Sequence, residues 1–368
     1  MFKLLLTIGI VALLQQTAVA QATQPADDAA KLYLQAAQIL SDDDAKNIMS
    51  PASSSLTYPD YPPMTDAWLQ MEKPDYELHA QVRELMHEAA TLNYAAWPPF
   101  VRSKGPSSIS YLNGCRNLAN EIADASLYQS LVLNDQPAAF QTAGDLFHLA
   151  DLLKNQPGEI LIRLLVGEGL EAIDTARLMD IISGVKITQD ATNTRDLPLT
   201  TATQWISRLL DHPSAQAELD QSMRQEPAGA TTNPSITRSL IRILEEVRRI
   251  QSGRDMAAMS LAAHVYQSKH GQWPANLQQL STELPRLPID PWGDGKQTLG
   301  YALIQGGLPD GNDRPLVYSR CGAKNGLYYR IDQPIYSFTQ SGGGQFRDVA
   351  SWFPPESTPP APTTQPLE

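Results

Sequence analysis

Between residues 117 and 210, apolar residues recur every three or four positions, which places them on one face of a helix. The pattern predicts four helices, at 117–132, 135–153, 160–182 and 203–210. Asn134 or Asp135 is expected to cap the second helix, whose first turn holds Pro137. Short turns bring such helices together as antiparallel neighbours that bury their apolar faces. Residues 21–212 are therefore expected to form a helical bundle or a short helical stack.

Two more helices are predicted before this series, at 29–40 and 75–94. Residues 50–66, between them, are rich in Ser, Pro and Tyr. Each Pro removes an N–H donor and disfavours helix at the residue before it. This segment is therefore expected to be an extended linker.

The C-terminal part of the chain has a different pattern. Residues 213–235 are polar and are expected to be a linker, and 236–269 form one long amphipathic helix in which Gly253 can mark a break. Short runs rich in Tyr, Val, Ile and Leu follow and predict an antiparallel meander; they lie at 299–304, 315–318, 326–331 and 335–339. The fold class is thus mainly α, with a long helix and a small β module in residues 236–353. Residues 354–368 are Pro-rich and are expected to be disordered.

The N-terminus has the three parts of a secretory signal peptide. A short positive region ends at Lys3, residues 4–14 form an apolar run of 11 residues, and Ala18-Val19-Ala20 provides a cleavage site. A membrane-spanning helix needs about 20 apolar residues, so this run is too short to be an anchor. Cleavage is expected after Ala20, with Ala22 as the alternative, which would place the protein in the periplasm or outside the cell.

No second membrane span is expected after cleavage. The most apolar window, 160–182, is interrupted by charged residues: Arg163, Glu168, Glu171, Asp174 and Arg177. The net charge of −12 also disfavours binding to nucleic acid, whose phosphates would be repelled. The partner expected from these properties is another protein of the cell envelope.

The chain has two cysteines, Cys115 and Cys321. An exported protein can keep a disulfide, so the two can pair and join the helical part to the C-terminal module. They can equally be buried free thiols, which behave as small hydrophobic residues. The spacing leaves both alternatives open, and it carries no metal-binding signal.

No catalytic motif is found. There is no Gly-x-Ser-x-Gly sequence, and Gly293-Asp294-Gly295-Lys296 lacks the spacing of a phosphate-binding loop. His79 and His87 are eight positions apart and are expected on a solvated helix face, whereas His148 is expected in the core or at its boundary. Four aromatic residues are expected in the core rather than in a ligand pocket: Tyr128, Phe140, Phe147 and Trp205.

Oxygen-bearing side chains on two turns of the C-terminal module are candidate calcium ligands. They are Asp290, Asp294, Asp310, Asn312 and Asp313. Calcium prefers such oxygens, but turns also select Asp and Asn for their own hydrogen bonds. Calcium is therefore the one candidate cofactor, and local turn chemistry is the alternative.

Residues 257–319, about a sixth of the chain, resemble the C-terminal region of the major pseudopilins of type II secretion. The matching residues are Tyr266, His270, Gly271, Trp273, Pro274, Leu277, Leu280, Pro288, Asp290, Pro291, Trp292, Gly293, Tyr318 and Ser319. The resemblance implies a fold and no activity. It departs from the family in two ways: the N-terminal helix that builds filaments is missing, and the loop 320–325, where the family binds calcium, has no carboxylate.

The combination of a helical region and this block also resembles uncharacterised exported proteins of planctomycete-type bacteria. That resemblance implies no substrate. The function expected is a non-enzymatic envelope protein that binds another protein or assembles with it. The alternative is an exported hydrolase with an unrecognised site in the helical domain.

Overall fold

The computed structural model describes residues 28–45, 66–98, 110–154, 161–190, 193–212, 234–305, 313–319 and 328–330. In this part the protein is mainly helical, as the sequence predicts. The longer helices are α2 (Ala29–Ala45), α3 (Asp66–Leu78), α4 (Ala80–Ala90), α5 (Tyr111–Leu131), α6 (Gln136–Lys154), α7 (Leu161–Ser183), α8 (Leu199–Asp211) and α10 (Pro234–His270). None of the described helices is both long enough and apolar enough to cross a lipid bilayer.

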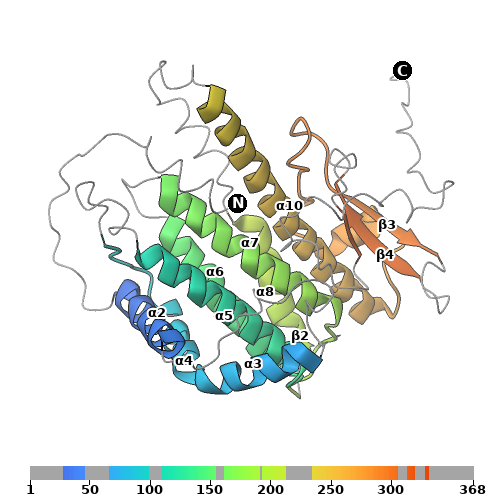
Figure 1. Ribbon diagram of the computed structural model, residues 1–368. Helices are drawn as coiled ribbons and strands as arrows, with labels where there is room; N and C mark the ends of the chain where they lie inside the picture. The colour runs from blue at the N-terminus through green and yellow to red at the C-terminus, as the bar shows by residue number, and fades with distance from the viewer. Residues whose placement is uncertain are drawn as a thin grey trace.

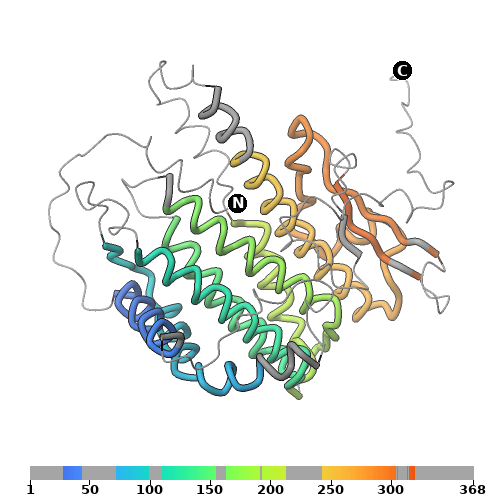
Figure 2. The backbone as a smooth tube through the Cα atoms, in the orientation of Figure 1, coloured from blue at the N-terminus to red at the C-terminus, as the bar shows by residue number. Residues whose placement is uncertain are grey.

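The helices pack in an order close to their order in the sequence. Helices α5, α6 and α7 lie side by side in the middle of the molecule, with α2, α3 and α4 on one side (Figure 1). Helix α10 packs against the other side of α7 and against α8, and strands β3 and β4 lie beyond α10. Figure 2 shows the chain crossing the molecule from the α2 side to the β3 side. The helices and strands thus pack mostly against elements that are near them in the sequence.

Helix ends follow from local chemistry. Oδ1 of Asp135 accepts a hydrogen bond from the Ala138 N–H at 3.1 Å, which confirms the predicted cap of α6. Helix α10 ends at His270, and the next residue, Gly271, has φ 69°, a conformation that favours glycine.

Three strands form the small antiparallel sheet that the sequence predicts. Strands β3 (Gly300–Ile304), β4 (Arg314–Tyr318) and β5 (Tyr328–Arg330) lie in the order β3-β4-β5. Tyr301 is opposite Val317, and Val317 is opposite Tyr329. A second, two-stranded parallel sheet was not predicted; it pairs β1 (Ile187–Thr188) with β2 (Leu197–Pro198). The fourth predicted run, 335–339, lies outside the described residues.

Several predicted boundaries were wrong. Helix α3 begins at Asp66, inside the predicted linker, and continues through Pro74, so the expected helix 75–94 is two helices that meet at His79. Helix α10 begins at Pro234, within the linker predicted at 213–235, and does not break at Gly253. A long helix can tolerate one glycine when it is packed along its length, as α10 is against α7 and α8. The signal peptide (1–20), most of the linker 50–66 and the tail 354–368 lie outside the described residues.

The larger of the two main cores crosses the predicted boundary between the helical domain and the C-terminal module. It contains Phe147 of α6, Ile181 of α7 and Trp205 of α8, together with Met259 of α10 and Val317 of β4. A second core lies between α2, α4, α5 and α6, around Tyr33 and Met86. In the described residues, one hydrophobic core therefore spans the helical part and the C-terminal module, and the other lies within the helical part.

Candidate functional site

Helix α7 carries charged side chains that are buried in the bundle. Glu168, Glu171, Asp174, Arg177 and Asp180 recur every third position along it, and each is less than 9% exposed. With 3.6 residues per turn, each step of three positions turns by about 60° around the helix axis, so the charges form a stripe that winds around α7. Buried charges are stable only when they are paired or neutralised. The stripe therefore has to find its partners on the neighbouring helices.

At one end of the stripe, Glu171 is the centre of a buried cluster. Its carboxylate accepts hydrogen bonds from Lys154 of α6 and Arg254 of α10. Nε2 of His212, at the end of α8, lies 3.0 Å from Oε2 of Glu171. Burial by itself would raise the pKa of Glu171, but Arg254, His212 and Lys154 outweigh burial and hold this pKa well below its ordinary value. Glu171 is thus ionised and joins four helices.

The other end of the stripe joins α7 to α5. Nε of Arg177 donates to Oδ1 of Asp124 at 2.9 Å, and both side chains are buried. Burial raises the pKa of Asp180 to about 7, although Arg177 acts against it. On the neighbouring helices, Nδ1 of His79 lies 2.9 Å from Oε1 of Glu121. This end of the stripe is enclosed in protein, so we interpret it as structural.

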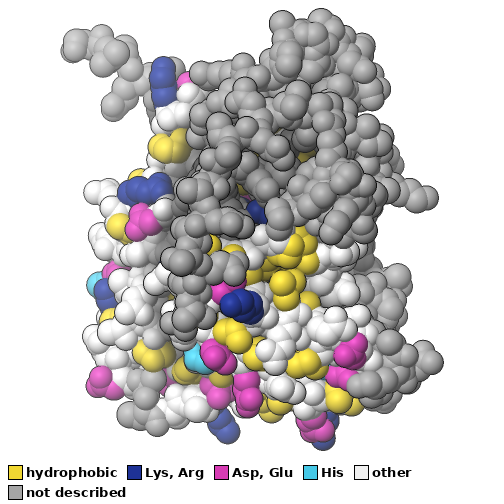
Figure 3. Space-filling view, turned by 90° about the vertical axis from the view of Figure 1, so that its left-hand side faces the viewer, with side chains coloured by type: hydrophobic (Ala, Val, Ile, Leu, Met, Phe, Trp, Pro, Cys, Tyr) yellow, Lys and Arg dark blue, Asp and Glu magenta, His cyan; other side chains and the backbone are white. Residues whose placement is uncertain are grey.

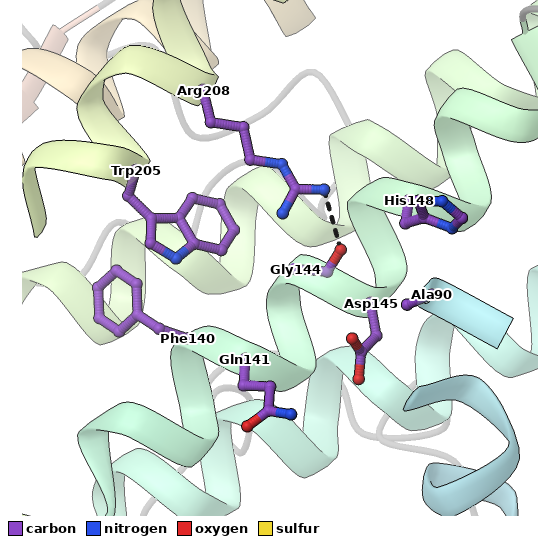
Figure 4. Close-up of a pocket in the computed structure, with 8 residues that line it drawn as sticks. All are labelled: Ala90, Phe140, Gln141, Gly144, Asp145, His148, Trp205 and Arg208. Carbon is purple, nitrogen blue, oxygen red and sulfur yellow. Dashed lines mark hydrogen bonds between the residues drawn. The ribbon is translucent and has the colours of Figure 1, made fainter. Parts of the chain in front are cut away.

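An open pocket lies between α4, α6 and α8 (Figure 4). Its volume is about 230 Å³, and its lining is formed by Ala90, Phe140, Gln141, Gly144, Asp145, His148, Trp205 and Arg208. Small-molecule sites usually measure about 300–1,000 Å³, so this pocket fits a side chain or a terminal group better than a large substrate.

The guanidinium of Arg208 occupies the middle of the pocket. It lies 5.2 Å from the centroid of the Trp205 ring and 5.5 Å from that of Phe147, and its Nη2 donates to the Gly144 carbonyl at 3.0 Å. Figure 4 shows it reaching from α8 across to α6 at Gly144. A Cβ at position 144 would lie 3.0 Å from Nη1, so glycine leaves room for this contact. Aromatic rings and a carbonyl therefore hold the cation in one orientation.

Asp145 and His148 complete the polar part of the wall. Burial raises the pKa of Asp145 to about 6, although His87 and Arg208 act against it. Nδ1 of His87 lies 3.4 Å from the Asp145 carboxylate. Nδ1 of His148 is 2.9 Å from the Tyr33 hydroxyl, and His148 also bonds to the backbone of Leu92.

The bonds of His148 limit what it can do chemically. Burial lowers the pKa of His148, so its ring is neutral near pH 7. With one nitrogen held by Tyr33 and a further bond to the backbone, this ring is poorly placed to act as a general base.

The calcium candidates that the structure describes, Asp290, Asp294 and Asp313, do not form a group that could hold a metal ion. Asp290 is buried, and its two carboxylate oxygens lie 2.8 and 2.9 Å from Oγ of Ser319. Oδ1 of Asp290 also accepts from the Trp292 N–H at 3.1 Å, whereas Asp294 is exposed and accepts from the Lys296 N–H. Asp313 is exposed, and Asp310 and Asn312 lie outside the described residues. Among the described residues, no group of three or more His, Cys, Asp or Glu could hold a metal ion.

The motif residues of the C-terminal module have structural contacts. Nε1 of Trp292 donates to Ser252 Oγ at 3.0 Å, and Trp273 packs edge-on against His264. The Pro274 carbonyl accepts from the Tyr301 hydroxyl at 2.8 Å, and the Pro288 carbonyl from the Leu299 N–H. The remaining motif residues lie at the end of α10 (His270, Gly271) and in the turn after Asp290 (Pro291, Gly293).

Cys115 is a free thiol in the described structure and is 1% exposed. Burial raises its pKa to about 12, so it is not a nucleophile near pH 7. Cys321 lies outside the described residues, and its pairing with Cys115 stays a prediction.

Two predictions about individual residues need comment. His79 is 1% exposed, so the prediction of a solvated face at His79 was wrong; α3 and α5 bury it, and Glu121 pairs with it. The four aromatic residues Tyr128, Phe140, Phe147 and Trp205 belong to the core as predicted. Phe140 and Trp205 also line the pocket, which the sequence did not indicate.

Neither the charged stripe nor the pocket was predicted from the sequence. A signal for the stripe was present, because Glu168, Glu171, Asp174 and Arg177 recur every third residue in an apolar helix. Such spacing indicates a buried polar stripe as well as excluding a membrane span. The pocket had no such signal, since its lining comes from three helices far apart in the sequence.

Acidic side chains gather on the lower part of the face shown in Figure 3, with hydrophobic ones among them.

Comparison with protein-family models, with curated proteins and with solved structures finds no match to this chain. The function has therefore to be argued from the residues themselves.

Proposed function

We propose that this protein is exported and acts in the cell envelope as a non-enzymatic component that binds another protein. The observation that carries the proposal is the pocket between α4, α6 and α8. It presents one cation in a fixed orientation, Arg208, and its eight lining residues include no Ser, Thr, Cys or Lys. A small recess with a fixed charge and without a hydroxyl, thiol or amine nucleophile suits recognition better than chemistry.

The N-terminal pattern supports export, and the net charge of −12 supports a partner other than nucleic acid. A pseudopilin-like C-terminal module is part of the proposal. A helix that ends at His270, just before Gly271, and is followed by a three-stranded antiparallel sheet supports this comparison. The exported planctomycete-type proteins stay its proposed relatives.

Export is tested by fractionating cells that express the full chain and sequencing the N-terminus of the product. We expect a periplasmic or extracellular product that starts at Gln21. A cytosolic product that keeps residues 1–20 would contradict the proposal.

Binding is tested with a photo-crosslinking residue at position 141, which is exposed at the pocket. A control protein carries the same residue at position 249 on α10. After irradiation of intact cells, we expect one discrete adduct from position 141 and none of that mass from position 249. A chain that stays monomeric and gives no adduct from either position would count against a binding function.

The second candidate is an exported hydrolase, and one observation favours it. Asp145 is a carboxyl group with a pKa raised to about 6 in a pocket, which is a property of general acids and bases. A broad set of covalent hydrolase probes, applied to the wild type and to Asp145→Asn, tests it. Hydrolysis or labelling that disappears in Asp145→Asn would favour this candidate over the binding function.

A further inference from the structure

We infer that the pocket between α4, α6 and α8 binds the C-terminal residue of a partner polypeptide, with Arg208 pairing its carboxylate. This inference rests on the proposed binding function and names the chemistry that is recognised. It depends on three features of the pocket: a cation without a carboxylate partner, an acceptor on the wall, and a volume that fits one terminal residue.

Arg208 is the feature that calls for an anion. It forms no ion pair with any of the described residues, and one of its five N–H donors reaches Gly144. Trp205 and Phe147 hold the guanidinium plane, so the remaining donors keep a constant direction. A carboxylate, like a phosphate, matches the paired donors of a guanidinium better than neutral groups do. The site is therefore arranged for a ligand carboxylate before the ligand arrives.

Asp145 restricts which carboxylate fits. An anion that offered acceptors alone would be repelled by this side chain on the same pocket wall. The last residue of a polypeptide carries its carboxylate next to its own peptide N–H, so it can pair with Arg208 and donate to Asp145 at once. Gln141, at the exposed edge, has its Nε2 2.9 Å from Nδ1 of His87, so its carbonyl oxygen is the group that can accept from the preceding peptide N–H. Chain termini are a known kind of recognition target for such sites.

Gly144 sets the position of Arg208. A methyl group there would lie 3.0 Å from Nη1 of Arg208 and 3.5 Å from Cζ2 of Trp205. The guanidinium would have to shift by a few tenths of an ångström, while every charge in the pocket stays the same. Because alanine is also the better helix former, Gly144→Ala is a positional variant that should fold.

The test uses the chain without residues 1–20 and two peptide mixtures. One is a mixture of N-acetylated tetrapeptides of random sequence with free C-terminal carboxylates, and the other is the same mixture with amidated C-termini. Binding is measured by retention of the peptides on immobilised protein. We expect the amidated mixture to bind at least about tenfold more weakly, the loss of one charge-assisted hydrogen bond.

Four variants make the test specific. Arg208→Gln and Gly144→Ala should each weaken binding of the free-carboxylate mixture at least about tenfold. Arg208→Lys should bind this mixture more tightly than Arg208→Gln but more weakly than the wild type, because lysine lacks the paired donors of a guanidinium. Arg249→Gln, an exposed arginine on α10, is the matched control and should bind as the wild type does. Melting temperatures of all four show whether a loss of binding is a loss of folding.

Equal binding of the two mixtures, or binding that survives in Arg208→Gln, would overturn the inference. Free amino acids that bind as tightly as the peptides would overturn the assignment to a polypeptide terminus. The outcome is separable from that of the proposed function. A crosslinked partner that Arg208→Gln still captures would leave the binding function standing and this inference wrong.

Discussion

Nε2 of His212, just after α8, lies 3.0 Å from Oε2 of Glu171 in the middle of α7. Lys154 of α6 and Arg254 of α10 donate to the same carboxylate, which is 0% exposed. Four helices therefore meet at one side chain. The buried charges of such a site are all paired while the cluster is complete. Removing one member destabilises the fold, because the remaining buried charges lose their partner.

Glu171→Gln tests this relationship. The amide keeps the shape of the side chain but removes the charge and places an NH2 group opposite either Lys154 or Arg254. We expect the free energy of unfolding to fall by about 3–5 kcal/mol, the usual result of breaking a buried ion pair. Equilibrium urea unfolding measures it. Glu246→Gln, which breaks a more exposed pair with Arg249 on α10, should change stability by less than about 1 kcal/mol.

Stability should fall as pH rises from 5 to 8. Burial raises the pKa values of Glu168, Asp180 and Asp255 to about 7, each opposed by a nearby Lys or Arg. In the unfolded chain these groups titrate near pH 4, so the folded protein binds more protons between pH 4 and 7. Their contribution is fully present below about pH 4 and is lost as pH rises through about 7.

Two buried groups act in the opposite direction. Burial lowers the pKa of His264 to about 4, and the pKa of Glu171 is held low by its partners, so both favour the folded state more as pH rises. The effect of Glu171 is complete by about pH 5. Between pH 5 and 8, the carboxyl groups with raised pKa values, Glu72 and Asp145 included, outweigh His264 and His148, whose pKa values are lowered. Urea unfolding at four pH values gives the slope, which should be smaller in Asp180→Asn and unchanged in Glu246→Gln.

Asp290→Ala should lower the stability of the C-terminal module. Ser319 Oγ and the Trp292 N–H both donate to Asp290, so the substitution leaves buried donors without an acceptor. The expected cost is about 1–3 kcal/mol by thermal or urea unfolding. Asp294→Ala, in the same turn but exposed, should cost less than about 0.5 kcal/mol.

Asp290 and Asp294 are also candidate calcium ligands, and EDTA tests that prediction. Hydrogen bonds within the protein already occupy the Asp290 oxygens, so EDTA should leave the melting temperature of the wild type unchanged. A melting temperature that EDTA lowers, and that calcium restores, would show that these carboxylates bind the ion after all.

Cys115 should not react with iodoacetamide in the native protein, since it is buried and its pKa is raised to about 12. After unfolding in urea without reductant, we expect the reagent to label it. Mass spectrometry of the tryptic peptides measures this. If Cys115 is labelled only after reduction, the alternative in which it pairs with Cys321 is the correct one.

The helices could be predicted from sequence because their signals are local. Asp135 and Pro137 mark the start of α6, and Gly271 marks the end of α10, within a few residues of the groups they affect. The errors arose where tertiary packing overrides such signals. Pro74 lies inside α3 although proline disfavours helix, and His79 is buried although the sequence pattern predicts a solvated face.

The candidate site could not be predicted in the same way. Arg208 and Gly144, which face each other in the pocket, are 64 positions apart, and Arg254 and Glu171 are 83 apart. Nothing in the spacing of either pair indicates that they meet. The aromatic residues around Arg208 were correctly expected in the core, but whether a core residue also borders a recess depends on helix positions that no local pattern contains.

The sequence by itself determined the helical class, the capped start of α6, the turn at Gly271 and the antiparallel meander, because backbone periodicity and turn conformation depend on near neighbours. Only the tertiary structure decided that the charges of α7 face inward and that α4, α6 and α8 leave a pocket around Arg208. The physical reason is that a buried charge is defined by its partners, and here those partners come from helices brought together by burial of their apolar faces.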